Sequence, residues 1–170
     1  MHVMVATDGA MDPEAGAALA AKLAADGGQV TVFTVVEVPR RLLADMRSAA
    51  DGAETSKLQE VSVEYRADQA DDPRPSSWIG DDAVVERYVA ARIKAATAGL
   101  VAQLDAAGVA HEVVGEESEN CAQAIIDAAQ GRDVDVLCVG TRGLGRFEGL
   151  LGSVSTKVAR RAGCAVLLVR

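Results

Sequence analysis

The chain has 170 residues, of which 49% are apolar and 25% are charged, and its formal net charge at pH 7 is −8. This length and composition support one domain with a sizeable core and exclude a disordered chain. The acidic charge disfavours nucleic acid as a partner, and the apolar runs are too short to span a membrane.

The first predicted element is a buried strand over residues 2–8, within the opening MHVMVATDG. This opening lacks the charged start and the cleavage site of a signal peptide, so we expect a cytoplasmic protein. Asp12 followed by Pro13 predicts a helix start, because an N-cap residue precedes proline at the first helical position. Gly27 is expected to end that helix.

The valine-rich residues 29–38 predict a second strand. Residues 40–80 have no clear periodicity and are interpreted as an insertion or long loop within a single domain that spans residues 1–170. A long helix is predicted over 81–107, and VAHEVV, at 109–114, predicts the third strand.

The last third of the chain continues the alternation with a helix over 121–130, a fourth strand at 134–139, a helix over 154–162 and a fifth strand at 164–169. Near-continuous apolar strands that alternate with helices are typical of a parallel sheet covered on both faces. We therefore expect an α/β fold, a three-layer sandwich with five parallel strands and a Rossmann-like arrangement.

The three cysteines, Cys121, Cys138 and Cys164, lie in apolar or helical patterns without the spacing of metal ligands. They are predicted to be reduced, buried thiols. The two histidines, His2 and His111, are likewise predicted to be structural, since no pattern pairs either with a nucleophile. No catalytic residue is predicted.

The sequence GTRGLGRFEGLLGSVST, at 140–156, is the most informative segment, because five of its seventeen residues are glycine. From Gly140 onwards the chain has six Lys or Arg and one Glu, a net charge of +5, whereas the preceding residues carry −13. Glycine amides and the start of the following helix are typical of an anion site. The segment is not a P-loop, because no lysine occurs between Lys94 and Lys157.

The same segment resembles the signature of the universal stress protein family: Gly, two residues, Gly, nine residues, Gly, then Ser or Thr. Here Gly140-Thr-Arg-Gly143 and Gly152-Ser153 match its halves, although eight residues separate them. VATDG at 5–9 and VFTVVEVP at 32–39 resemble the family's first two strands. Two further departures are Ala10, where the family commonly has Ser, and the absence of Gly-x-Pro-Ala before the helix at 121–130.

The resemblance implies the strand order 3-2-1-4-5 of the adenine nucleotide alpha hydrolase-like fold. It also implies binding of ATP or AMP, with Mg or Mn bridging the phosphates. Asp8, with Ala6 and Thr7, would lie at the ribose or adenine. Val35 would contact adenine, and Val139 with Gly140 would line the nucleotide. The residues at the phosphates would be Gly143, Gly152, Ser153 and Val154, with Arg142 and Ser155 as neighbours.

Two functions are compatible with this resemblance. The first is a regulatory stress-response module that binds ATP at the loop from Gly140 to Ser155 and hydrolyses it slowly at most. The alternative is a family member that does not bind ATP and acts through protein contacts as a homodimer. The apolar final strand at 164–169 would then pair with a second copy.

Overall fold

The computed structural model describes residues 1–25, 27–39, 81–141 and 152–169, with the side chains of 81–84 excepted. Its contacts divide the chain into two units, Met1–Glu37 with Val89–Arg170, and Val38–Tyr88. The predicted insertion at 40–80 lies outside the described residues, and a single domain over 1–170 stays a prediction. The elements are β1 (His2–Ala6), α1 (Pro13–Leu23), β2 (Gln29–Val36), α4 (Asp81–Ala106), β3 (His111–Glu117), α5 (Cys121–Gly131), β4 (Val136–Gly140), α6 (Ser153–Arg161) and β5 (Ala165–Val169).

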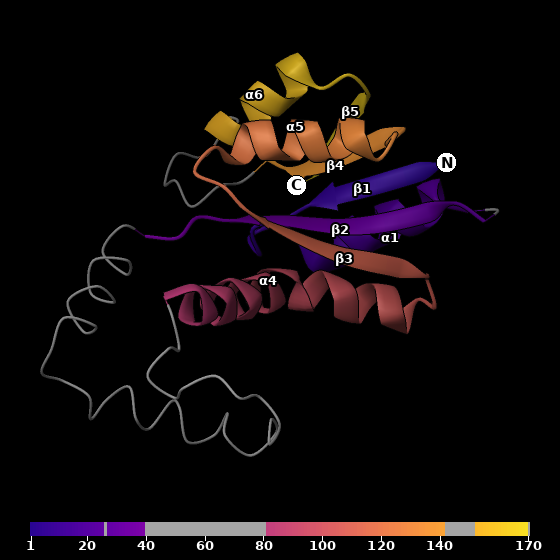
Figure 1. The fold of residues 1–170 in the computed structure, drawn as a ribbon. Coiled ribbons are helices and arrows are strands. Elements are labelled where there is room, and N and C mark those ends of the chain that lie inside the picture. Colours follow the sequence, from indigo (N-terminus) through magenta and orange to yellow (C-terminus); the bar gives the residue numbers. More distant parts are fainter. Residues whose placement is uncertain (26, 40–80, 142–151, 170) are drawn as a thin grey trace, which may run out of the picture. The chain divides into compact units, whose positions relative to one another are not determined.

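The five strands form one parallel sheet in the order β3-β2-β1-β4-β5, which confirms the predicted fold class and strand order (Figure 1). Strand β1 is central, and Val5 pairs with Val32 of β2 on one side and with Cys138 of β4 on the other. Valine suits this position because its β-branched side chain packs well on a pleated surface.

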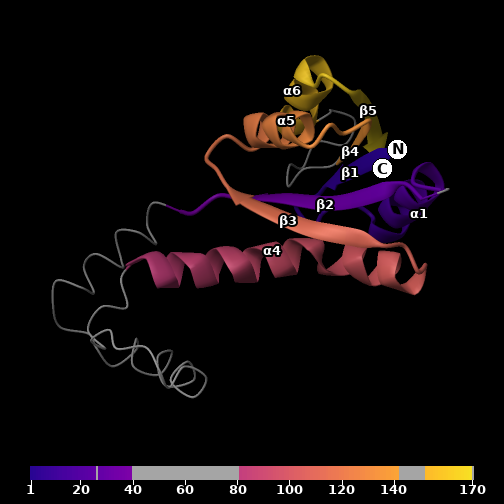
Figure 2. The same cartoon turned by 45° about the vertical axis from the view of Figure 1, so that its right-hand side comes forward.

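Alternation along the strands divides the core between the two faces of the sheet. Val3 and Val5 pack with Leu100 and Leu104 of α4 and with small residues of α1. Met4 and Ala6, whose side chains point to the other face, pack instead with α5 and α6. Figure 2 shows the resulting sandwich, in which α1 and the part of α4 from Val89 cover one face and α5 with α6 cover the other.

The predicted caps at Asp12 and Gly108 are confirmed, whereas α1 ends at Leu23, before the predicted stop at Gly27. Asp12 Oδ1 accepts hydrogen bonds from the backbone N–H groups of Glu14, at 3.0 Å, and Ala15, at 3.4 Å, and Pro13 opens the helix. Gly108, at φ +65°, follows α4 in the left-handed conformation that glycine tolerates best. None of the helices among the described residues combines the length and apolar character that a membrane span needs.

The predicted end of the third strand was wrong, because β3 continues to Glu117 instead of stopping at residue 114. Val36 pairs with Glu117, so backbone hydrogen bonding extends this edge strand through an acidic segment that lacks a strand pattern. Gly115 lies within the extension, and a Cβ there would collide with the side chain of Ile93 in α4. The glycine therefore lets α4 approach β3 closely.

Candidate functional site

The candidate site lies where β1 and β4 end side by side. Ala6 pairs with Val139, and Thr7 N–H continues the pairing by donating to Phe33 O of β2 at 2.9 Å. Thr141 N–H donates to Val169 O of β5 at 2.8 Å. The order of the strands reverses here, since β2 follows β1 on one side and β4 lies on the other. Ligands of open α/β sheets commonly bind at such a point.

A tight turn follows β1 and is held by its own side chains. Asp8 Oδ1 accepts from Ala10 N–H at 2.9 Å, and Thr7 Oγ1 accepts from Gly9 N–H at 3.0 Å. Gly9 has φ +90°, a conformation that favours glycine over residues with a side chain. One carboxylate oxygen of Asp8 therefore stabilises the turn after β1.

The start of α6 is fastened to the end of β4. Ser155 is buried, and its Oγ donates to Gly140 O at 2.7 Å. Gly152 is the N-cap of α6 and has no side chain that could accept from the first N–H groups of the helix. Ser153 and Val154, the first two helical residues, are exposed. The positive end of the helix dipole is thus fixed beside the end of β4.

The predicted residues fall into two groups on the described part of the chain. Ala6 and Val139 belong to the core cluster on the α5/α6 face, and Val35 packs against that cluster. Their side chains therefore share a face with α6. Thr7 instead lines a small open pocket between the turn after β1, the start of α1 and residues 95–100 of α4. The sequence analysis missed this pocket, whose only signal is the run of small residues in KAATAGL.

The predicted phosphate ligand Gly143 and its predicted neighbour Arg142 lie outside the described residues, as does the rest of the loop to residue 151. The described half of the predicted cradle consists of Gly140 and the start of α6. Among the residues that the structure describes, no group of three or more His, Cys, Asp and Glu side chains could hold a metal ion.

The cysteines do not add a reactive group to the described site. Cys138 is fully buried in β4, and burial raises the pKa of its thiol to about 11, so the thiol is neutral at physiological pH. Burial also raises the pKa of Cys164. All three cysteines are free, as predicted, but Cys121 and Cys164 are only half-buried.

Comparison with known proteins supplies a family context for this geometry. The family model described as "Usp: Universal stress protein family" matches residues 1–170. A curated relative from Thermus aquaticus, "Universal stress protein in QAH/OAS sulfhydrylase 3'region", is 54% identical over 50 residues. That match covers 29% of this chain and spans only 36% of the relative's length.

Solved structures resemble the chain over nearly its whole length. A universal stress protein from Archaeoglobus fulgidus has a TM-score of 0.58 at 16% identity, with 100% of this chain and 98% of that chain covered. A universal stress protein in complex with cAMP has a TM-score of 0.55 at 22% identity, with 100% and 97% covered. An Arabidopsis thaliana family protein with AMP bound has 0.52 at 17% identity, with 99% and 90% covered. At these identities the likeness establishes the fold.

The bond between Ser155 and Gly140 generates a stability prediction. Ser155→Ala removes the donor and is expected to lower the free energy of unfolding by about 1 kcal/mol, because the part-buried carbonyl of Gly140 loses its bond to a buried hydroxyl. Ser153→Ala, on the exposed first residue of α6, is the matched control and is expected to change it by less than about 0.5 kcal/mol. Urea unfolding measures both, and equal losses in the two variants would contradict the anchoring role of Ser155.

Proposed function

This chain belongs to the universal stress protein family, and on that basis we propose that it binds an adenine nucleotide, ATP or AMP, at the carboxyl ends of β1 and β4. The observation that carries the proposal is the start of α6, which has a glycine N-cap and is held beside β4 by the Ser155–Gly140 bond. Backbone N–H groups at such a helix start favour a bound phosphate.

The proposed phosphate ligands are Gly143, Gly152, Ser153 and Val154, with Arg142 and Ser155 as neighbours. Ser153 is exposed, so its hydroxyl is available to a ligand. The hydroxyl of Ser155 already donates to a backbone carbonyl, and its contribution is to position the helix.

The adenosine would extend from Gly140 and Val139 across the end of β1 towards Val35 of β2. Ala6 provides a small side chain on the same face, which leaves room for a flat base. Asp8, together with Thr7, would contact the ribose or the base. Two of the structural relatives are solved with adenine nucleotides, cAMP in one case and AMP in the other, which supports this class of ligand.

A Mg or Mn ion would accompany the phosphates of ATP. Since no group of three or more His, Cys, Asp and Glu side chains could hold a metal ion among the described residues, phosphate oxygens and water would supply most of the ion's ligands. The proposed role is regulatory: occupancy by ATP or AMP sets the state of a cytoplasmic stress-response module. No catalytic residue is proposed, and hydrolysis would be slow at most.

A charge reversal at the helix start tests the site. Ser153→Glu is expected to abolish binding of ATP with magnesium, because a carboxylate would lie against the phosphates at the start of α6. Ala159→Glu is the matched control, since it adds the same charge to an exposed position late in the same helix. Isothermal titration measures both affinities.

The control variant is expected to bind ATP as the wild type does. If Ser153→Glu retains the wild-type affinity while the wild type binds ATP, the nucleotide occupies a different site. If the wild type itself does not bind ATP or AMP, the proposed function is wrong.

A second candidate function is favoured by the two edges of the sheet, which differ in character. Edge strand β5 exposes two large apolar side chains, Leu167 at 37% and Leu168 at 44%. The opposite edge strand, β3, exposes one large apolar side chain, Val113, but also carries Glu112, Glu116 and Glu117. Charged residues on an edge strand disfavour its pairing with a strand of another chain, whereas an exposed apolar edge favours such pairing. We propose that two copies of the chain associate through β5, either alongside nucleotide binding or instead of it.

Leu168→Lys tests this association. Lysine at the proposed interface is expected to raise the dimer dissociation constant by about tenfold or more, because it places a charge in an apolar contact. Val113→Lys, at an exposed position on β3, should leave the dissociation constant unchanged. Sedimentation over a range of protein concentrations measures both, and a wild type that remains monomeric throughout would refute the dimer.

A further inference from the structure

The outer face of α6 begins at the proposed phosphate site and carries positive charge. Ser155 and Val158 are the buried residues of this helix, whereas Ser153 and Lys157 are exposed. Residues four positions apart lie on the same face of a helix, so Lys157 lies one turn after Ser153 on the side that faces solvent. Helical side chains lean towards the helix N-terminus, which directs the Lys157 side chain back towards Ser153.

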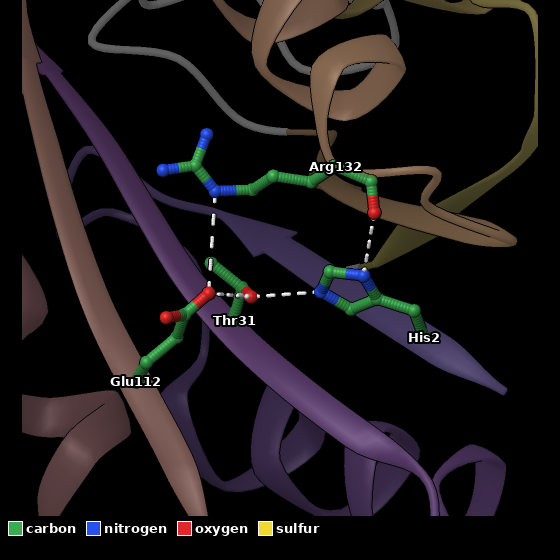
Figure 3. Close-up of polar contacts among 4 residues, drawn as sticks. All are labelled: His2, Thr31, Glu112 and Arg132. Carbon is green, nitrogen blue, oxygen red and sulfur yellow. Dashed lines mark hydrogen bonds and ion pairs between the residues drawn. The ribbon is translucent and has the colours of Figure 1, made fainter.

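The ammonium of Lys157 has no ion pair or hydrogen bond with any residue that the structure describes. No Asp or Glu occurs in residues 152–169, so neither α6 nor β5 offers it a carboxylate. At the opposite end of the sheet, by contrast, Arg132 Nε lies 4.0 Å from Glu112 Oε1 (Figure 3). Lys157 is therefore a cation that the described part of this acidic chain leaves to solvent or to a ligand.

The start of α6 has a limited number of hydrogen-bond donors. Thr156 N–H makes the first intrahelical bond, to Gly152 O at 2.9 Å, so the N–H groups of residues 152–155 have no partner within the helix. The exposed side-chain donors in the first two turns are the Ser153 hydroxyl and the Lys157 ammonium. A ligand that needs more than the backbone groups must therefore draw on these two side chains.

ATP and AMP differ in what they require from these donors. The single phosphate of AMP can be satisfied by the backbone N–H groups at the helix start. The two further phosphates of ATP add negative charge and acceptor oxygens beyond that set. A lysine ammonium supplies three N–H donors together with a positive charge, so it suits the outer phosphates.

We propose that Lys157 makes the site prefer ATP to AMP by donating to the outer phosphates of ATP. This inference rests on the proposed nucleotide site and adds to it a residue that lies outside the glycine signature. Arg160 is also exposed, but it lies three residues further from the helix start, which is about 4.5 Å along the helix axis. It therefore contributes to the general positive charge and not to the contact.

The test compares the dissociation constants of ATP and AMP, each with magnesium, by isothermal titration. The wild type is expected to bind ATP more tightly than AMP. Lys157→Gln is expected to weaken ATP binding by about tenfold and AMP binding by less than about twofold, because only the outer phosphates lose a charge-assisted hydrogen bond. AMP is the internal reference, since a general loosening of the site would weaken both nucleotides.

Two further variants separate the contact from the overall charge. Arg160→Gln removes the same charge from an exposed position on the same helix and should change both dissociation constants by less than about twofold. Lys157→Arg keeps a charged donor and should retain the preference for ATP. All three substitutions are at exposed positions, so the fold is expected to be unaffected.

The outcomes distinguish this inference from the proposed function. If the wild type binds both nucleotides and Lys157→Gln weakens neither, or weakens both equally, the role of Lys157 is wrong while the nucleotide site stands. The role is also wrong if Arg160→Gln reduces the preference for ATP as much as Lys157→Gln does. A wild type that binds neither ATP nor AMP overturns the proposed site, and this inference with it.

Discussion

The parallel pairing of β1 with β2 and β4 is the constraint on which the rest of the structure depends. All five residues of β1 pair with β2, and the last four also pair with β4. Its alternating side chains from Val3 to Ala6 are apolar and buried on both faces, so both faces of the strand must be covered by helices. This placement also makes the carboxyl end of β1 the point where the strand order reverses and gives its amino end neighbours on both sides.

The two ends of β1 use this position differently. At the carboxyl end, short side chains and glycines leave backbone groups of the turn and of α6 close to the surface, and Ser155 fixes the helix start. At the amino end, His2 fills the corresponding space with a side chain that bonds to Thr31 and to the end of α5. The arrangement at the carboxyl end suits a bound anion. The arrangement at the amino end connects β1 to β2 and to the end of α5.

Much of the fold could be predicted from the sequence because its signals are local. Runs of valine indicated the strands, and Asp12 with Pro13 indicated the start of α1. The extension of β3 to Glu117 could not be predicted, since Glu116 and Glu117 are paired by the register of β2 and not by their own apolar pattern. The expected order of the strands came from the family resemblance, which the topology confirms.

The candidate site was predictable only in part. Glycine spacing indicated a ligand loop, but the bond between Ser155 and Gly140 joins residues fifteen positions apart and depends on how α6 docks. The contacts of His2 had no sequence signal, because Thr31 and Glu112 come from strands far along the chain. Only the register of the parallel sheet brings these three residues together.

The central claim is that the ends of β1 and β4 hold an adenine nucleotide, and the purified protein tests it most directly. The protein is denatured and removed, and any released small molecule is identified by chromatography before added ATP and magnesium are titrated. The account predicts ATP or AMP, either released near one per chain or bound on titration. No released nucleotide and no binding of ATP or AMP on titration would contradict it.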